Sequence, residues 1–154
     1  MQEMMTLYRK QRNESQTTYI ATSTYPNTQT YNGIIQAWSN SGHPDAPVRA
    51  EAILMSLLGQ NSTSERLDLP IAKDVAADTY TFNSVISCWA KSGLPEAGER
   101  AEQLLSLLEN GRTPTGQPLD IEADIITYNS LMNAWARSGR GEEGARKTEE
   151  VLNR

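Results

Sequence analysis

The chain has 154 residues, a formal net charge of −5 and a single cysteine, with 38% hydrophobic and 21% charged residues. One cysteine excludes an internal disulfide and a cysteine-based metal cluster. No apolar run reaches the ~18 residues that a membrane-spanning helix needs. The negative charge counts against a nucleic-acid-binding protein, in which a basic face is expected.

An internal repeat dominates the sequence. Residues 30–42 read TYNGIIQAWSNSG, residues 81–93 read TFNSVISCWAKSG, and residues 127–139 read TYNSLMNAWARSG. The copies are spaced by 51 and then 46 residues, and all three tryptophans of the chain occupy the same repeat position. A period of this size is typical of solenoid proteins, whose structural units stack in a row.

Each copy has apolar residues at i, i+3, i+4 and i+7, which is the pattern of an amphipathic helix. We therefore expect the first helix of each unit at residues 28–41, 79–92 and 125–138. Glycine adopts the left-handed conformation of a helix C-cap most easily. The Ser-Gly pairs are expected to end these helices at Gly42, Gly93 and Gly139.

A second amphipathic helix follows in each unit, and Pro44 and Pro95 fit its first turn. Each unit is thus expected to be a helical hairpin joined by a short turn. The apolar stripes of the second helices are Val48, Ala50, Ile53, Leu54 and Leu57; Ala97, Ala101, Leu104, Leu105 and Leu108; and Ala145, Thr148, Val151 and Leu152.

The units are joined by segments rich in Gly, Pro, Ser, Thr and Asp, which we interpret as loop insertions at 59–78 and 109–124. Residues 1–12 look like the second helix of an earlier unit, so we expect the chain to be an excerpt of a longer array. The predicted boundaries are 1–26 for a partial preceding repeat and linker, 27–78 for repeat 1, 79–124 for repeat 2, and 125–154 for a truncated repeat 3.

The recurring T-[YF]-N pattern with its W-x-[KRN]-S-G ending resembles the pentatricopeptide repeat, in a variant with long inter-repeat loops like those of algal and protist organellar proteins. The resemblance implies an all-α fold, a right-handed α-solenoid of stacked helix-turn-helix repeats. It also implies binding of single-stranded RNA at about one base per repeat, in mitochondria or plastids, with a role in organellar RNA processing, stability or translation. No targeting segment is visible in this chain.

The resemblance further implies which side chains meet RNA. The residue after the aromatic and the last residue of the repeat form the base-reading pair, and an Asn–Asp pair resembles the family's uridine-preferring combination. Repeat 1 departs from the pattern, with Gln29 at the clamping position and Asn40 at the phosphate position. Carried over, the base-reading residues are Asn32, Asp78, Asn83, Asp124 and Asn129; the base clamps are Tyr80 and Ile126; the phosphate contacts are Lys91 and Arg137.

Other interpretations of these residues stay open. The Asn residues could instead bridge neighbouring repeats, and an Asp directly before a helix is a common N-cap. Asn27 could cap the first copy, the tryptophans and Cys88 are expected in the core, and His43 in an exposed turn. A polar stripe along the first helices could also accept a protein or peptide, as in tetratricopeptide scaffolds, or the array could be purely structural.

No enzyme is indicated. The chain lacks phosphate-binding glycine loops, zinc-binding histidine motifs and nucleophile elbows, so we expect no catalytic residue, cofactor, metal or small-molecule substrate. The three first-helix windows contain no Asp or Glu. The net charge of −5 is therefore segregated onto second helices and loops, and we expect RNA binding by three repeats to be weak.

Overall fold

The computed structural model describes residues 26–59 and 75–153. Over these ranges the chain forms helices and no β-strand, and the expected all-α fold of stacked helical hairpins is confirmed. The predicted helix in residues 1–12 lies outside the described residues. The helices are α2 Thr28–Ser41, α3 Ala46–Leu57, α4 Thr79–Ser92, α5 Ala97–Asn110, α6 Ile125–Arg137 and α7 Glu142–Leu152.

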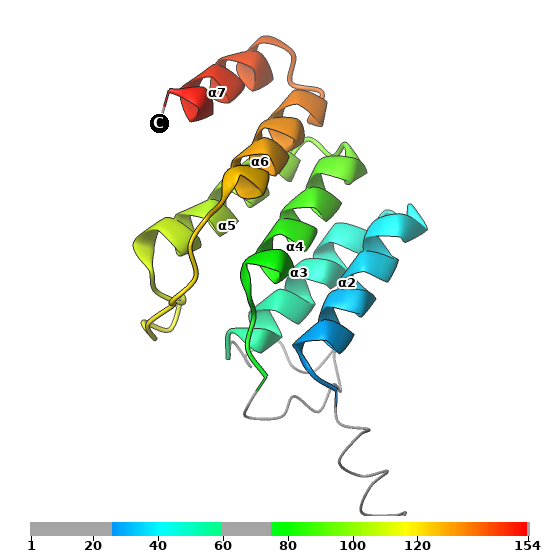
Figure 1. The fold of residues 1–154 in the computed structure, drawn as a ribbon. Coiled ribbons are helices and arrows are strands. Elements are labelled where there is room, and N and C mark those ends of the chain that lie inside the picture. The colour runs from blue at the N-terminus through cyan, green and yellow to red at the C-terminus, as the bar shows by residue number, and fades with distance from the viewer. Residues whose placement is uncertain (1–25, 60–74, 154) are drawn as a thin grey trace, which may run out of the picture.

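The helices form two layers (Figure 1). The first helices of the units, α2, α4 and α6, lie side by side in one layer, and α4 packs between the other two. The second helices pack behind them, each against the first helix of its own unit, while α3 also contacts α4 and α5 also contacts α6. This is the stacking expected of a helical solenoid.

The first helices of the three units begin with the same type of N-cap. The side chains of Asn27, Asp78 and Asp124 each accept a hydrogen bond from the backbone N–H three residues on, and a threonine hydroxyl there accepts from the cap's own N–H. This reciprocal arrangement is a capping box, and it satisfies two backbone donors that a helix start leaves unpaired. The predicted N-cap role of these three residues is confirmed.

Several details of the second helices differ from the sequence prediction. Pro44 and Pro95 precede the helices rather than entering their first turns, because Asp45 and Glu96 are the N-caps. Val48 and Leu152, expected in the apolar stripes, are 56% and 74% exposed, and Ala145 is exposed as well. Val48 has a counterpart in the next unit. The corresponding place in repeat 2 is held by Glu99, which is also exposed, so this position lies on the solvent side of the hairpin.

The core is one continuous apolar layer between the two sets of helices, and Cys88 and two of the tryptophans belong to it as expected. Trp89 and Trp135 are 3% and 1% exposed, whereas Trp38, in the first unit, is only partly buried. Trp135 packs directly on α5 of the preceding unit. A Cβ added at Gly98 of that helix would lie 2.3 Å from the Trp135 ring. Neighbouring units are therefore in close contact through tryptophan.

The inter-repeat segment after α5 has its own hydrogen bonds. Arg112 and Pro118 face each other in an isolated bridge, the amide of Thr113 donates to the carbonyl of Gln117, and that of Leu119 donates to Gly111. The predicted loop starts two residues later than expected, because α5 continues to Asn110. None of the helices in the described ranges is long and apolar enough to cross a membrane.

Candidate functional site

The two complete pairs of predicted base-reading residues contact each other across the boundary between units. The side-chain amide of Asn32 donates to Oδ1 of Asp78 at 3.4 Å, and that of Asn83 donates to Oδ1 of Asp124 at 3.0 Å. Each Asn belongs to one unit and each Asp caps the first helix of the next. The bridging role for Asn that the sequence left open is therefore present at both boundaries.

A threonine completes each cluster. The hydroxyl of Thr81 lies 2.7 Å from Oδ1 of Asn32, and the hydroxyl of Thr127 lies 2.6 Å from Oδ1 of Asn83. Both threonines are fully buried. The recurrence of Thr at the third residue of each first helix could have revealed this role from sequence, because a polar residue repeated in a buried register needs a hydrogen-bond partner.

The aspartates of these clusters are held in their charged form. Burial alone would raise the pKa of Asp78, but hydrogen bonds from the hydroxyl and amide of Thr81 and from Asn32 outweigh it and lower the pKa. The amide of Thr127 is the main cause of the lowered pKa of Asp124. A carboxylate that accepts several hydrogen bonds is stabilised in its ionised state.

The Asn–Asp–Thr contacts do not use every polar group of the clusters. The side chains of Asp78 and Asp124 accept the hydrogen bonds from Asn and Thr through Oδ1, and both residues are exposed. Asn32 and Asn83 remain 7% and 8% exposed, and each amide nitrogen has a second hydrogen. One acceptor, Oδ2, and one donor hydrogen therefore recur at the same place in both units.

Large apolar side chains are exposed next to these groups. Tyr80 and Ile126, the predicted base clamps, are 57% and 56% exposed on the first turns of α4 and α6. Gln29 holds the corresponding place on α2 and is also exposed. Exposed aromatic and apolar side chains beside polar groups are suited to stacking on a planar ligand.

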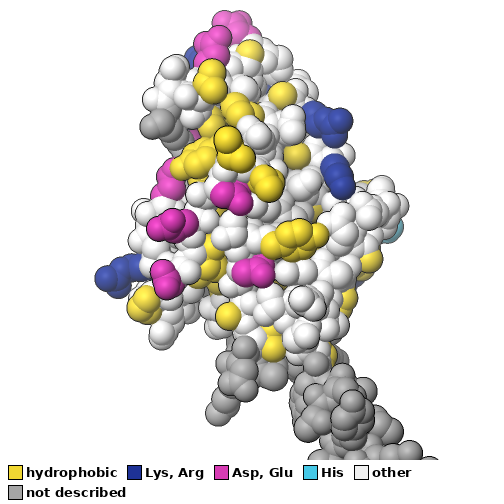
Figure 2. Space-filling model, viewed as in Figure 1, with side chains coloured by type: hydrophobic (Ala, Val, Ile, Leu, Met, Phe, Trp, Pro, Cys, Tyr) yellow, Lys and Arg dark blue, Asp and Glu magenta, His cyan; other side chains and the backbone are white. Residues whose placement is uncertain are grey.

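The two predicted phosphate contacts lie further along α4 and α6. Lys91 is exposed, and its amine donates to Ser39 Oγ at 3.3 Å and to Asn40 Oδ1 at 3.4 Å on the preceding unit. Arg137 is exposed and has no ion pair within the described ranges. Figure 2 shows basic side chains along one edge of this face and acidic side chains near its centre.

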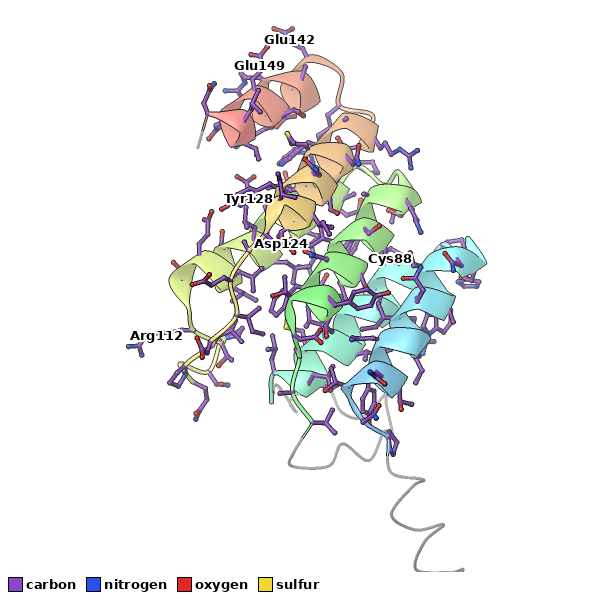
Figure 3. All side chains as sticks on the ribbon, viewed as in Figure 1. Cys88, Arg112, Asp124, Tyr128, Glu142 and Glu149 are labelled. Carbon is purple, nitrogen blue, oxygen red and sulfur yellow. The ribbon has the colours of Figure 1, made fainter. Side chains whose placement is uncertain are left out.

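The third unit offers only half of a cluster. Asn129 is exposed, and no hydrogen bond of its side chain to another described residue is recorded. Figure 3 shows Asp124 and Tyr128 near the start of α6. Asn129 thus occupies the place that Asn32 and Asn83 hold in a cluster, without the Asp and Thr that would follow.

A second inter-unit contact was not predicted from sequence. Trp89 donates from Nε1 to Glu51 at 2.8 Å, and Glu51 also pairs with Arg100. Burial raises the pKa of Glu51, while Arg100 and Trp89 partly offset that effect. The sequence feature that could have indicated this contact is the carboxylate of Glu51, which lies among the apolar residues on the buried side of the second helix.

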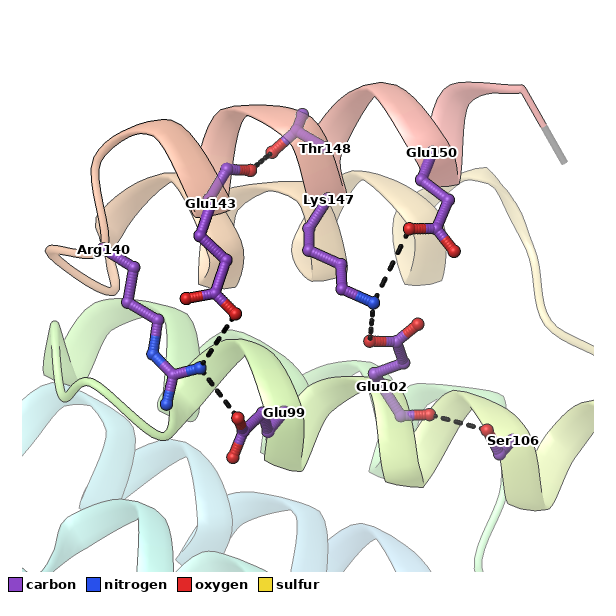
Figure 4. Close-up of polar contacts among 9 residues, drawn as sticks. Glu99, Glu102, Ser106, Arg140, Glu143, Lys147, Thr148 and Glu150 are labelled. Atoms are coloured by element: carbon purple, nitrogen blue, oxygen red, sulfur yellow. Dashed lines mark hydrogen bonds and ion pairs between the residues drawn. The ribbon is translucent and has the colours of Figure 1, made fainter.

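The corresponding contact between the second and third units uses other residues (Figure 4). Arg140 pairs with Glu99 at 2.7 Å, and Lys147 lies 4.0 Å from Glu102. Opposite charges therefore again join α5 of the second unit to the third unit. Nε1 of Trp135 is buried without a hydrogen-bond partner. In both boundaries the earlier unit supplies the carboxylate and the later unit supplies the cation.

Comparison with known proteins identifies the repeats. The family model described as PPR repeat matches residues 80–105 and 126–150, which cover the second and third hairpins. No curated protein and no solved structure matches the chain. Among the described residues, no group of His, Cys, Asp or Glu side chains is arranged to hold a metal ion.

Proposed function

Because the chain belongs to the pentatricopeptide repeat family, whose members are non-enzymatic helical scaffolds that in general bind RNA, we propose that α2, α4 and α6 form a surface for single-stranded RNA. Each repeat reads about one base. Asn32 with Asp78 and Asn83 with Asp124 are the reading pairs, and Asn129 supplies half of a third pair.

The observation that carries this proposal is the recurrence of the Asn–Asp contact. Asn83 and Asp124 are held together by a direct hydrogen bond, as are Asn32 and Asp78. A fixed pair presents its remaining donor and acceptor in one orientation, so little conformational entropy is lost when a base binds. Uracil offers two carbonyl acceptors and one N–H donor, which complement an amide hydrogen and a carboxylate oxygen, and uridine is the preferred base at repeats 1 and 2.

The surrounding side chains supply the sequence-independent part of binding. Tyr80 and Ile126, both more than half exposed, clamp the base planes. Lys91 and Arg137 contact phosphates. Members of the family commonly act in organelles, and we place this protein's RNA target in a mitochondrion or plastid.

The test is fluorescence anisotropy with short labelled oligonucleotides of U, A or C at low salt. We expect single-stranded U-rich RNA to bind best and duplex RNA to bind poorly. Tyr80→Ala should weaken binding by about 1–3 kcal/mol, the usual contribution of one stacked base. Asn83→Thr, which replaces the side-chain amide with a hydroxyl, should lower the preference for uridine at one nucleotide.

A matched pair of arginines separates a specific face from general charge. Arg137 and Arg146 are both exposed, the first on α6 and the second on the second helix α7. Arg137→Ala should reduce the slope of log affinity against log salt concentration by about one, whereas Arg146→Ala should leave this slope unchanged. Equal effects of the two variants, or capture of a peptide instead of RNA by the α2–α4–α6 face, would refute the proposal.

A further inference from the structure

The helix α4 carries one polar side chain toward each of its two neighbours. Thr81 contacts Asn32 on α2, and Asn83 contacts Thr127 on α6. Residues two positions apart on a helix point in different directions, so α4 gives its threonine to the contact on one side and its asparagine to the contact on the other. The threonine of a unit therefore contacts the asparagine of the unit before it.

The hydrogen bonds of these clusters determine which way the Asn amide is turned, since the orientation of an amide follows from its partners. The amide nitrogen of Asn83 donates to Asp124 at 3.0 Å, and its amide oxygen lies 2.6 Å from the hydroxyl of Thr127. That hydroxyl has a single hydrogen and lies closer to the amide oxygen than to the Asp124 carboxylate, which is 2.9 Å away. The cluster of Asn32 has the same order, with 2.7 Å to the amide oxygen and 2.8 Å to the carboxylate.

The aspartate and the threonine favour the same orientation of the amide for different reasons. In the opposite orientation the amide oxygen would face the carboxylate, and two acceptors would meet without a hydrogen between them. In the observed orientation the amide oxygen needs a donor, and the threonine hydroxyl supplies it. Asn32 and Asn83 are only 7% and 8% exposed, and at such a buried place an acceptor without a donor is unfavourable. Removal of the hydroxyl would therefore take away much of the advantage of the observed orientation.

We propose that Thr81 and Thr127 are positioning residues for base recognition, each of which holds the Asn of the preceding unit with an amide hydrogen toward the RNA. This assignment rests on the proposed function, in which that hydrogen meets a base. An amide hydrogen pairs with a carbonyl oxygen, and uracil has a carbonyl where cytosine has an amino group that donates. Each threonine thus favours uracil over cytosine at the nucleotide read by the unit before its own. A reading position then comprises three residues from two units.

The threonines also have a structural role, because both belong to the capping boxes at which α4 and α6 begin. Loss of a cap destabilises the fold and weakens binding to every base by the same factor. Loss of positioning changes the ratio of the affinities for uracil and cytosine at one nucleotide. This U-to-C ratio is therefore the quantity to measure, since the folded fraction of the protein cancels from it.

The measurement is fluorescence anisotropy of the full chain at low salt, with labelled U-rich oligonucleotides in which C replaces U at one nucleotide at a time. Asn32→Ala and Asn83→Ala first identify the nucleotide that each unit reads, as the one at which the preference is lost. Thr127→Val should then lower the U-to-C ratio at the nucleotide of Asn83 by about 2–10-fold, the change that corresponds to one hydrogen bond. Thr81→Val should have this effect at the nucleotide of Asn32 instead.

Two further variants separate the hydroxyl from its surroundings. Thr127→Ser keeps the hydroxyl and should retain the native ratio. Thr79→Val removes another threonine hydroxyl at the same boundary between units, one that donates to the backbone carbonyl of Glu122 at 3.2 Å, and it should change neither ratio. If circular dichroism shows that Thr127→Val does not fold, Thr127→Ala removes the same hydroxyl with a residue that favours helices.

The other outcomes overturn the assignment. Unchanged ratios in folded variants that lack the hydroxyl would refute positioning by threonine and leave RNA recognition in place. A shift at the nucleotide of Asn83 caused by Thr81→Val would mean that the threonine acts on its own helix. Equal shifts from Thr127→Val and Thr79→Val would indicate a general weakening of the boundary. A native chain that binds no RNA would refute the proposed function, and this assignment with it.

Discussion

Gly98 is the position where one methyl group should have the largest effect on the packing between units. It lies within α5 and is buried, and a Cβ built there would be 2.3, 2.4 and 2.8 Å from three atoms of the Trp135 ring. Real Cβ atoms do not approach other heavy atoms so closely. Trp135 is 1% exposed, so its ring has little free space into which it could move.

Two opposing effects decide the result of Gly98→Ala. Alanine is favoured over glycine inside a helix by about 1 kcal/mol. Overpacking of a buried site costs about 1–3 kcal/mol, and more where the neighbour cannot shift. Because the overlap involves three atoms of a rigid ring, we expect the steric cost to exceed the helical gain and destabilise the protein by about 1–2 kcal/mol.

Gly33→Ala is the matched control, since Gly33 is also a helical glycine but has no atom within 4 Å of an added Cβ. There only the helical gain remains, and stability should rise by up to about 1 kcal/mol. Thermal unfolding followed by circular dichroism would measure both, at about 2–4 °C per kcal/mol for a protein of this size. A Gly98→Ala protein as stable as Gly33→Ala would refute the close packing of Trp135 on α5.

Two further predictions concern the polar contacts between units. Glu51→Ala should lower the free energy of unfolding in urea by about 1–3 kcal/mol, because it leaves the buried N–H of Trp89 unpaired. Glu51→Gln can still accept that hydrogen bond and should lower it clearly less. Equal losses in the two variants would show that the hydrogen bond is unimportant. The pKa of Asp124 is lowered in the folded state relative to about 3.9 in unfolded chains, so its contribution to stability is present above about pH 4 and is lost as the pH falls through the folded pKa. Asp124→Asn should therefore flatten the acid decline of the melting temperature below about pH 4, and an unchanged pH profile would contradict the lowered pKa.

The positions of the first helices could be predicted from the sequence almost to the residue. The helices α2 and α4 have the predicted bounds, and α6 ends one residue early. Local signals determine both ends: an Asn or Asp cap with Thr three residues on, and a glycine after the last turn, as at Gly42 and Gly93, with φ of 66° and 64°. Such signals need no knowledge of the tertiary structure.

The contacts between units could not be predicted in the same way. Val48 and Leu152 fit an apolar stripe by spacing but are exposed, because exposure depends on which hairpin lies beside them. The Glu51–Arg100 pair joins residues 49 positions apart in different units, and helical periodicity within one unit gives no information on such a pair. Only the comparison of equivalent positions between units would have suggested it.

In the base reading that we propose, a single residue serves both stability and recognition. Asp124 caps α6 and accepts from Asn83 of the preceding unit, and its hydrogen bonds with Asn83 and Thr127 all end on Oδ1. Had Asn83 been held by two acceptors, or Asp124 by donors on both oxygens, the inter-unit contact would leave nothing for a base. Because each group is only half used, the contact that stacks the repeats also fixes the direction of the donor and acceptor that remain. If the proposed base reading holds, the distance between neighbouring reading positions is set by the stacking of the hairpins and not by the length of the loops between them.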